Sequence, residues 1–241
     1  MKERIGLYFI LGFIVLILIF ILSAVFYLPW LHFKKINITG NLHIQESELF
    51  RKLIIANLSN PFAKYLGYTN MLIWNNTNIK EPLIKKITIQ RNWLERSINI
   101  KVEEQERYAV WCLESACFWI TDQGQILEKA PQSEGQLMKI VNSNQKINPK
   151  PGENILLAEE FFYLKIILDK INNLNISILS INYNAQTLEL TIKTSTGPRL
   201  LFSLYFNPLL TISALEEIMS KQKLGSMEYI DLRIENKIYY K

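Results

Sequence analysis

The chain has 241 residues, enough for one or two ordinary domains. It carries 27 basic and 22 acidic residues, a formal net charge of +5, and 49% of its residues are hydrophobic. Because the basic residues are scattered among glutamates, without a run of five like charges, the pattern favours a solvated mixed surface over a nucleic-acid-binding stripe. We therefore expect no nucleic acid among the partners.

An apolar stretch without Lys, Arg, Asp or Glu runs from Ile5 to Phe33. At about 1.5 Å per residue it is long enough to cross a hydrocarbon core of about 30 Å, and it exceeds the roughly 7–15 apolar residues of a cleaved signal peptide. The sequence thus predicts a transmembrane helix over residues 5–31, in contact with a lipid bilayer. Basic residues flank both ends, so the short tail at residues 1–4 makes a cytoplasmic N-terminus the default. The expected localisation is a single-pass type II protein of the bacterial cell (inner) membrane, with its C-terminal domains extracytoplasmic.

A small α+β unit is predicted next, over residues 34–104. A short alternating strand ends at Gly40, and an apolar stripe at helical spacing predicts a helix over residues 44–58. Residues 59–70 are expected to form a loop, and a second helix is expected over residues 77–86 with Pro82 in its first turn. Two alternating segments around a polar loop at residues 91–96 then predict a hairpin. This β-α-α-β-β order would bury one sheet face under two helices.

Residues 105–241 are predicted to form a mixed, mostly antiparallel β domain with two helices. The expected elements are a hairpin at 108–119, a turn at 122–124, a largely loop-like segment at 129–152, a helix at 155–174, strands at 179–183, 188–192 and 200–204, a helix at 211–221 and a final strand at 229–241. The fold class expected for the whole chain is α+β, with the transmembrane helix preceding both units.

The only two cysteines, Cys112 and Cys117, flank the predicted hairpin tip Leu113–Ala116. Facing each other across the strands, they could form a disulfide, which would indicate an oxidising compartment. Two reduced structural thiols are the alternative. A metal site is not expected, since two thiolates without a nearby His or further Cys cannot fill a tetrahedral site.

Catalytic motifs are not recognisable in the sequence, so we expect a protein that is not an enzyme. His32 lies at the edge of the apolar stretch and His43 beside a predicted helix start. The carboxylates of Glu103, Glu104 and Glu106 are best explained as a solvated strand end. Metalloprotease, hydrolase and phosphate-binding signatures are missing together. No catalytic residue, metal or cofactor is therefore predicted.

Four segments, taken in order, resemble the FtsQ/DivIB family of bacterial cell-division proteins. They are Ile36–Asn41, Ile98–Glu104 leading into Tyr108–Trp111, Ile120–Ile126, which resembles the family's aromatic-x-x-Asp-x-x-Gly segment, and Glu228–Arg233. The resemblance covers essentially the whole chain and implies a POTRA domain at residues 34–104 and an FtsQ-type β domain at 105–241. The chain departs from the family in having Leu94 after Trp93, where proline is common.

The resemblance implies a divisome scaffold at the division site. FtsQ-like proteins bind single-pass coiled-coil proteins of the FtsB/DivIC and FtsL types, and through them help to control septal peptidoglycan synthesis by the FtsW–FtsI pair. Two other functions remain open: a membrane-anchored extracytoplasmic cell-wall enzyme, and a POTRA-type chaperone of exported chains.

The expected binding mechanism is strand addition at an exposed sheet edge. In the final strand Ile230, Leu232 and Ile234 alternate toward one face, and Asp231 and Arg233 could pair on the other. The alternative is that this strand only closes the β domain. The candidate partner-binding residues are Tyr229, Asp231, Arg233, Ile234, Asn236, Ile238 and Tyr239.

Overall fold

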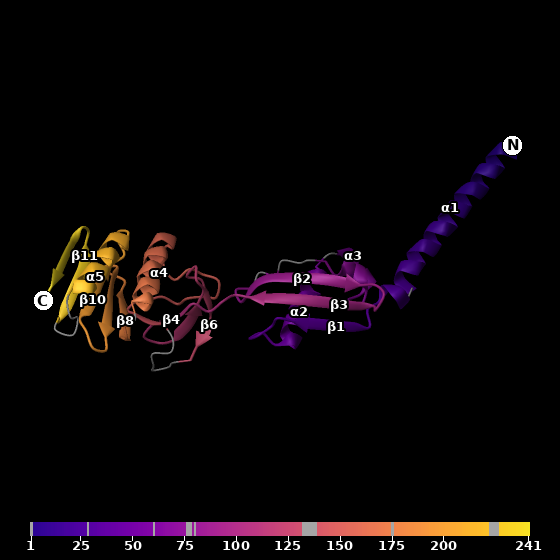
Figure 1. Ribbon diagram of the computed structural model, residues 1–241. Helices are drawn as coiled ribbons and strands as arrows, with labels where there is room; N and C mark the ends of the chain where they lie inside the picture. Colours follow the sequence, from indigo (N-terminus) through magenta and orange to yellow (C-terminus); the bar gives the residue numbers. More distant parts are fainter. Residues whose placement is uncertain are drawn as a thin grey trace. The chain divides into compact units, whose positions relative to one another are not determined.

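The computed structural model describes residues 2–27, 29–59, 61–75, 79, 81–131, 139–174, 176–221 and 227–241. The chain divides into two compact units, Met1–Glu104 and Gln105–Lys241. Both units contain helices and sheet, so the protein is α+β, with the large sheet in the second unit (Figure 1).

The first helix, α1, runs from Lys2 to Tyr27. Within the described part of the chain, no helix combines the length and apolarity that crossing a bilayer requires. This finding corrects the prediction of a transmembrane helix over residues 5–31 and the single-pass membrane localisation built on it.

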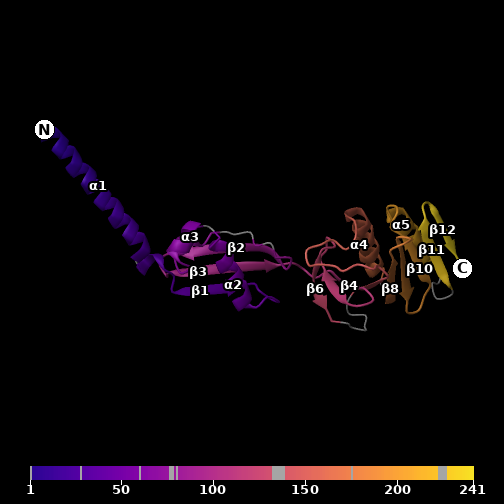
Figure 2. The same cartoon turned by 180° about the vertical axis from the view of Figure 1, so that it is seen from behind.

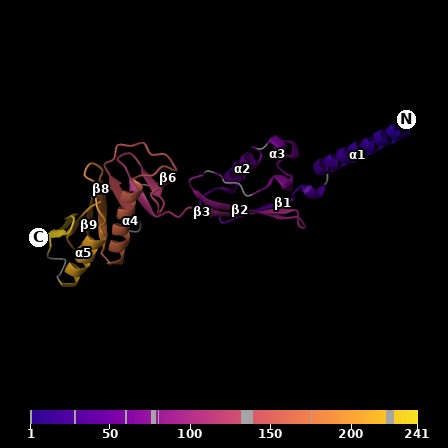
Figure 3. The same ribbon diagram turned by 90° about the horizontal axis from the view of Figure 1, so that it is seen from above.

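The first unit holds a three-stranded sheet of β1 (Lys35–Thr39), β2 (Ile84–Asn92) and β3 (Ser97–Glu104). The order is β1-β3-β2, with β1 parallel and β2 antiparallel to β3. Helices α2 (Glu46–Asn57) and α3 (Pro61–Leu66) lie on one side of this sheet (Figure 3). Short 3-10 turns occupy Pro29–Leu31 and Met71–Ile73.

The core of the first unit follows from the alternation along β3. Ile98, Ile100 and Val102 are buried, and they belong to one cluster with Leu49 and Leu53 of α2. Successive side chains of a strand point to opposite faces, so this alternation commits one face of β3 to the helices.

The second helix of this unit lies elsewhere than predicted. It is α3, inside the segment 59–70 expected to be a loop, whereas the expected helix 77–86 gives way to β2 from Ile84 onward; residues 76–78 and 80 lie outside the described residues. Pairing of β2 with β3 outweighs the weak helical stripe around Pro82. Pro61 at the first position of α3 was the usable signal, because proline suits a first helical turn.

Glu104, at the end of β3, is also placed differently from the predicted solvated strand end. Its side chain is 5% exposed. The carboxylate accepts hydrogen bonds from the backbone N–H groups of Leu42, His43 and Ile44 at 2.9–3.1 Å, and it lies 2.8 Å from His43 Nδ1. It thereby fastens the loop before α2 to the end of the sheet.

The second unit is built on a nine-stranded mixed sheet with the order β12-β11-β10-β9-β8-β7-β4-β5-β6. Its strands are β4 (Ala109–Cys112), β5 (Cys117–Ile120), β6 (Ile126–Ala130), β7 (Ile140–Ser143), β8 (Ile178–Asn184), β9 (Glu189–Thr194), β10 (Arg199–Ser203), β11 (Tyr229–Ile234) and β12 (Lys237–Tyr240). β7 lies within the segment 129–152 that was predicted to be largely loop, and residues 132–138 lie outside the described residues.

Two of the parallel pairs in this sheet, β7 with β8 and β10 with β11, are made possible by helices. Parallel neighbours need a crossover connection, and α4 (Ala158–Asn173) links β7 to β8 while α5 (Leu209–Lys221) links β10 to β11. Both helices lie against the sheet, and they contact each other (Figure 1). Phe161, Leu164 and Leu168 of α4 are buried in one core with Trp111 and Phe202 of the strands.

Candidate strand-addition edge

The C-terminal end of the chain is a hairpin of β11 and β12, not the single strand that the sequence predicted. The strands pair antiparallel through Ile230 with Tyr240, Asp231 with Tyr239 and Ile234 with Lys237, with an irregularity between Asp231 and Ile234. The chain turns at residues 235–236, where Asn236 has φ 60°, in the left-handed region that asparagine tolerates better than most residues. The prediction of an extended Asn236 is therefore wrong.

β12 is the outermost strand of the nine-stranded sheet, beside β11 (Figure 2). In the described part of the chain no strand pairs with its other side. The N–H of Lys241 donates to Tyr229 O, and Lys241 O accepts from Glu228 N. Because backbone groups of a strand point alternately to its two sides, those of Ile238 and Tyr240 face outward. The edge is thus a short template of unpaired donors and acceptors.

Side chains on this edge differ between the two faces of the sheet. Ile238 is half-buried and packs against the core, whereas Tyr239 and Tyr240 are 50% and 51% exposed. An incoming strand would meet Ile238 and Tyr240 on one face and Lys237 and Tyr239 on the other, since alternate residues share a face. The edge therefore offers two aromatic side chains beside its backbone.

Arg233 holds β11 in place through ion pairs with Asp231 and Glu189, and these contacts are called the Arg233 clasp below. The Arg233 guanidinium donates to both carboxylate oxygens of Asp231, at 2.9 Å from Nε and 2.6 Å from a terminal nitrogen, and its other nitrogen lies 3.1 Å from Glu189 on β9. Glu189 pairs with Ser203 of β10, so the guanidinium reaches across the whole width of β10. The hydrogen bonds from Arg233 hold the pKa of Asp231 below its ordinary value. The predicted pairing of Asp231 with Arg233 is present, and Glu189 extends it.

The structure separates the predicted partner-binding residues into three groups. Tyr229, Asp231, Arg233 and Ile234 lie on β11, whose backbone is already paired with β10 and β12. Asn236 lies in the turn. Only Ile238 and Tyr239 lie on the edge strand itself. Ile230 and Leu232 are buried as the alternation predicts, but Ile234 is exposed, because the irregularity and the turn take it beyond the core.

Sequence reasoning missed two members of the edge, Lys237 and Tyr240. The signal for them was the pair Glu235-Asn236 between two apolar-containing runs, which is typical of a turn. Treating residues 229–241 as one strand hid the turn that separates β11 from β12.

The other end of the sheet carries the cysteine hairpin. β4 and β5 pair with Cys112 opposite Cys117, and a disulfide joins the two residues. Among the described residues, no group of three or more His, Cys, Asp or Glu side chains is arranged to hold a metal ion.

No model of a known protein family matches this chain, and no curated protein matches it.

Proposed function

We propose that this protein is a non-enzymatic scaffold that captures an extended segment of a partner protein by strand addition to β12. The observation that carries the proposal is the position of β12 at the end of the sheet, with the backbone groups of Ile238 and Tyr240 facing outward. The likeness of Glu228–Arg233 to the FtsQ/DivIB terminal motif suggests the partner class. The partner would then be a coiled-coil protein of the FtsB/DivIC or FtsL type, and the process would be the control of septal wall synthesis.

The shortness of β12 limits what its backbone can contribute to binding. Two outward-facing residues offer about four hydrogen bonds, each worth about 0.5–1.5 kcal/mol net. The upper end of that range, about 6 kcal/mol, falls short of the about 8 kcal/mol of a micromolar complex. Tyr239 and Tyr240, which are rigid and half-exposed, must therefore supply the remaining affinity, as aromatic anchors commonly do at interfaces.

The arrangement of β11 suits this role, because β11 holds the edge strand β12 in place before a partner binds. The Arg233 clasp connects β11 to β9, so β12 is supported by a strand that is tied to the centre of the sheet. A pre-ordered edge loses less conformational entropy on binding than a mobile segment would.

The decisive experiment compares Tyr240→Pro with Tyr240→Ala in co-purification and titration with the FtsB/DivIC-type protein encoded in the same genome. Both variants lose the aromatic ring, but only proline removes the outward-facing N–H, and proline is tolerated on edge strands. We expect Tyr240→Ala to bind more weakly than wild type, and Tyr240→Pro to bind about fivefold more weakly again, the cost of one hydrogen bond of about 1 kcal/mol.

Thermal unfolding provides the control, because neither change touches a bond between β12 and β11. Both variants should unfold within a few degrees of wild type. Equal binding by the proline and alanine variants would show that the partner does not use the outward N–H of Tyr240. If both variants bound as tightly as wild type, β12 would not be part of the interface.

A further inference from the structure

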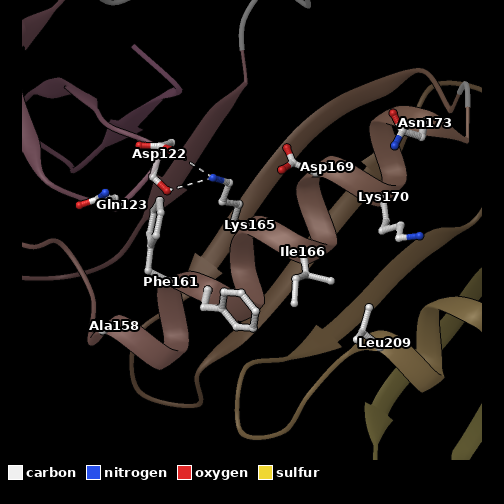
Figure 4. A pocket seen from close by; sticks show the side chains of 11 residues that line it. Asp122, Gln123, Ala158, Phe161, Lys165, Ile166, Asp169, Lys170, Asn173 and Leu209 are labelled. Atoms are coloured by element: carbon white, nitrogen blue, oxygen red, sulfur yellow. Dashed lines mark hydrogen bonds and ion pairs between the residues drawn. The ribbon is translucent and has the colours of Figure 1, made fainter. Parts of the chain in front are cut away.

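A groove on the outer side of α4 has no role in strand addition. Its volume is about 530 Å³, and it lies among α4, the turn at residues 122–123 and Leu209 at the start of α5 (Figure 4). A cavity of this size falls in the range of about 300–1,000 Å³ that is typical of ligand sites.

Two rows of side chains on α4 form the floor of the groove. Residues four apart lie above one another on a helix, so Phe162, Ile166 and Lys170 make one row, and Phe161, Lys165 and Asp169 the other. Phe162 is 56% exposed although it sits beside a buried neighbour, Phe161. The first row is thus apolar for two turns and ends in a cation.

The charges around the groove are paired, with a single exception among the described residues. Lys165 Nζ lies 3.3 Å from Asp122 Oδ2, and Asp169 Oδ1 lies 2.7 Å from Lys139 Nζ. Lys170 has no ion pair with any described residue. In Figure 4 its ammonium group points away from the Asp122–Lys165 pair, on the same side of the helix as Ile166 and Leu209.

Exposed apolar side chains continue from the groove toward α5. Leu209, which lines it, is 45% exposed, and the adjacent Leu210 is 68% exposed. The described part of the chain leaves this surface, which joins two neighbouring helices, open to solvent. Leucines exposed next to a half-exposed phenylalanine make an apolar patch of the kind that marks interaction sites.

We propose that the α4 groove is a docking site for an amphipathic acidic helix of a protein partner. The apolar face of that helix would cover Phe162, Ile166 and Leu209, and a carboxylate at its edge would pair with Lys170. A helix is the occupant that fits, because the groove is lined mostly by side chains of α4, together with Leu209 and the turn at residues 122–123, and offers no open edge of a strand. The unpaired charge is positive, which selects a negatively charged partner surface.

The proposal is independent of strand addition, because the groove and β12 share no residue. A partner could occupy one site without the other. Variants of β12 therefore serve as controls for the groove, and variants of the groove serve as controls for β12.

The test uses a fluorescein-labelled amphipathic peptide with Leu and Phe on one face and Glu on the other, titrated with the full chain and followed by anisotropy. A second peptide carries Lys in place of Glu. We expect saturable binding of the Glu peptide, weakening with added salt, and clearly poorer binding of the Lys peptide.

Two variants locate the binding. Lys170→Glu should weaken binding of the Glu peptide about three- to tenfold through charge reversal, and Phe162→Ala should weaken it about tenfold through lost apolar contact. Lys193→Glu makes the same charge change at an exposed lysine of β9 that lies outside the groove, and Tyr240→Pro changes only the sheet edge. Both should bind as wild type does.

Several outcomes would overturn the proposal. They are the absence of saturable binding of the Glu peptide, equal binding of the two peptides, and a loss in Lys193→Glu as large as that in Lys170→Glu. Dodecanoate serves as a probe for small amphiphiles. If dodecanoate binds at the groove and the Glu peptide does not, the groove is a site for a small amphiphile, and the proposal is overturned. Because the side chains of Lys170 and Phe162 are exposed, we expect both variants to unfold at the same temperature as wild type. A loss of binding in these variants is then a loss of contacts in the groove and not of the fold.

Discussion

The phenol hydroxyl of Tyr108 donates a 2.7 Å hydrogen bond to Oδ1 of Asp169, which lies on α4. The same oxygen accepts a 2.7 Å hydrogen bond from Lys139 Nζ. The ammonium groups of Lys139 and Lys165 lie 4.4 and 5.4 Å from the centre of the Tyr108 ring. Burial, together with the hydrogen bond to Asp169, raises the pKa of Tyr108, so the phenol stays a protonated donor. This network fastens α4 to the chain that leads into β4.

Replacing Tyr108 by phenylalanine removes that donor without removing the ring. We expect Tyr108→Phe to lower the free energy of unfolding by about 1.5–3 kcal/mol, the cost of losing one hydrogen bond to a carboxylate. Urea unfolding measures the change. Tyr163→Phe is the matched control, because Tyr163 of α4 donates at the same 2.7 Å to Glu159 in a hydrogen bond that is exposed to solvent. The control should unfold as wild type does, and equal losses in both variants would contradict the role assigned to Tyr108.

Glu104 makes the folding stability of the first unit depend on pH in the acidic range. Burial would raise the pKa of its carboxyl group, but hydrogen bonds from His43, Ile44 and Leu42 outweigh burial and hold that pKa below its ordinary value. A carboxyl group with a lowered pKa stabilises the folded state above its unfolded pKa, about 4.3, and this contribution disappears as the pH falls through the folded pKa.

Glu104→Gln tests this response through urea unfolding over a range of pH. Wild type should be more stable than the variant at neutral pH, and the difference should be constant there. Below about pH 4 the difference should shrink, because wild type is then protonated as well. A difference that stays the same at every acidic pH would rule out the ionised carboxylate as its source.

Substituting two glycines of the first unit distinguishes the cost of backbone strain from the cost of a steric clash. Gly40 and Gly67 both have positive φ, 85° and 77°. A Cβ on Gly40 would lie 2.2 Å from the carbonyl oxygen of Val102, whereas a Cβ on Gly67 meets nothing within 4 Å. We expect Gly67→Ala to cost about 1 kcal/mol from φ strain alone, and Gly40→Ala to cost at least about 2 kcal/mol more, because backbone must move. Differential scanning calorimetry of both variants would show equal melting temperatures if this contact were relieved cheaply.

The disulfide between Cys112 and Cys117 should contribute only modestly to the second unit. It closes a short loop, with a sequence separation of 5, and the chain-entropy relation assigns about 2 kcal/mol to a loop of that length. The double variant Cys112→Ser, Cys117→Ser should therefore remain folded and lose about 2 kcal/mol of unfolding free energy. Wild type measured with a thiol reductant should approach the variant. A variant that fails to fold would mean that the hairpin depends on the bond far more than its loop length implies.

Most of the individual helices and strands could be predicted from the hydrophobic periodicity of the sequence. The alternation of Ile98, Ile100 and Val102 determined which face of β3 is buried, and the helical stripe around Phe161 and Leu168 determined α4. Periodicity is local, so it can be seen within one segment. It failed where a short apolar pattern was ambiguous, as in the predicted helix whose last residues, from Ile84 onward, belong to β2 and pair with β3.

The candidate edge was predictable only in part. The apolar alternation of Ile230 and Leu232 pointed to a terminal strand with one buried face, but the break at Asn236 and the resulting hairpin were not anticipated. Only the hairpin places β12, and not β11, at the open side of the sheet.

The sequence by itself determined which residues are apolar in the right period, and so which faces turn inward. The tertiary structure alone decided which strand is outermost, that Arg233 reaches Glu189 across β10, and that Tyr108 meets Asp169. The physical reason is that burial follows from the spacing of neighbouring residues. Strand order and hydrogen-bond partners depend instead on contacts between segments far apart in the chain, and no local pattern encodes those contacts.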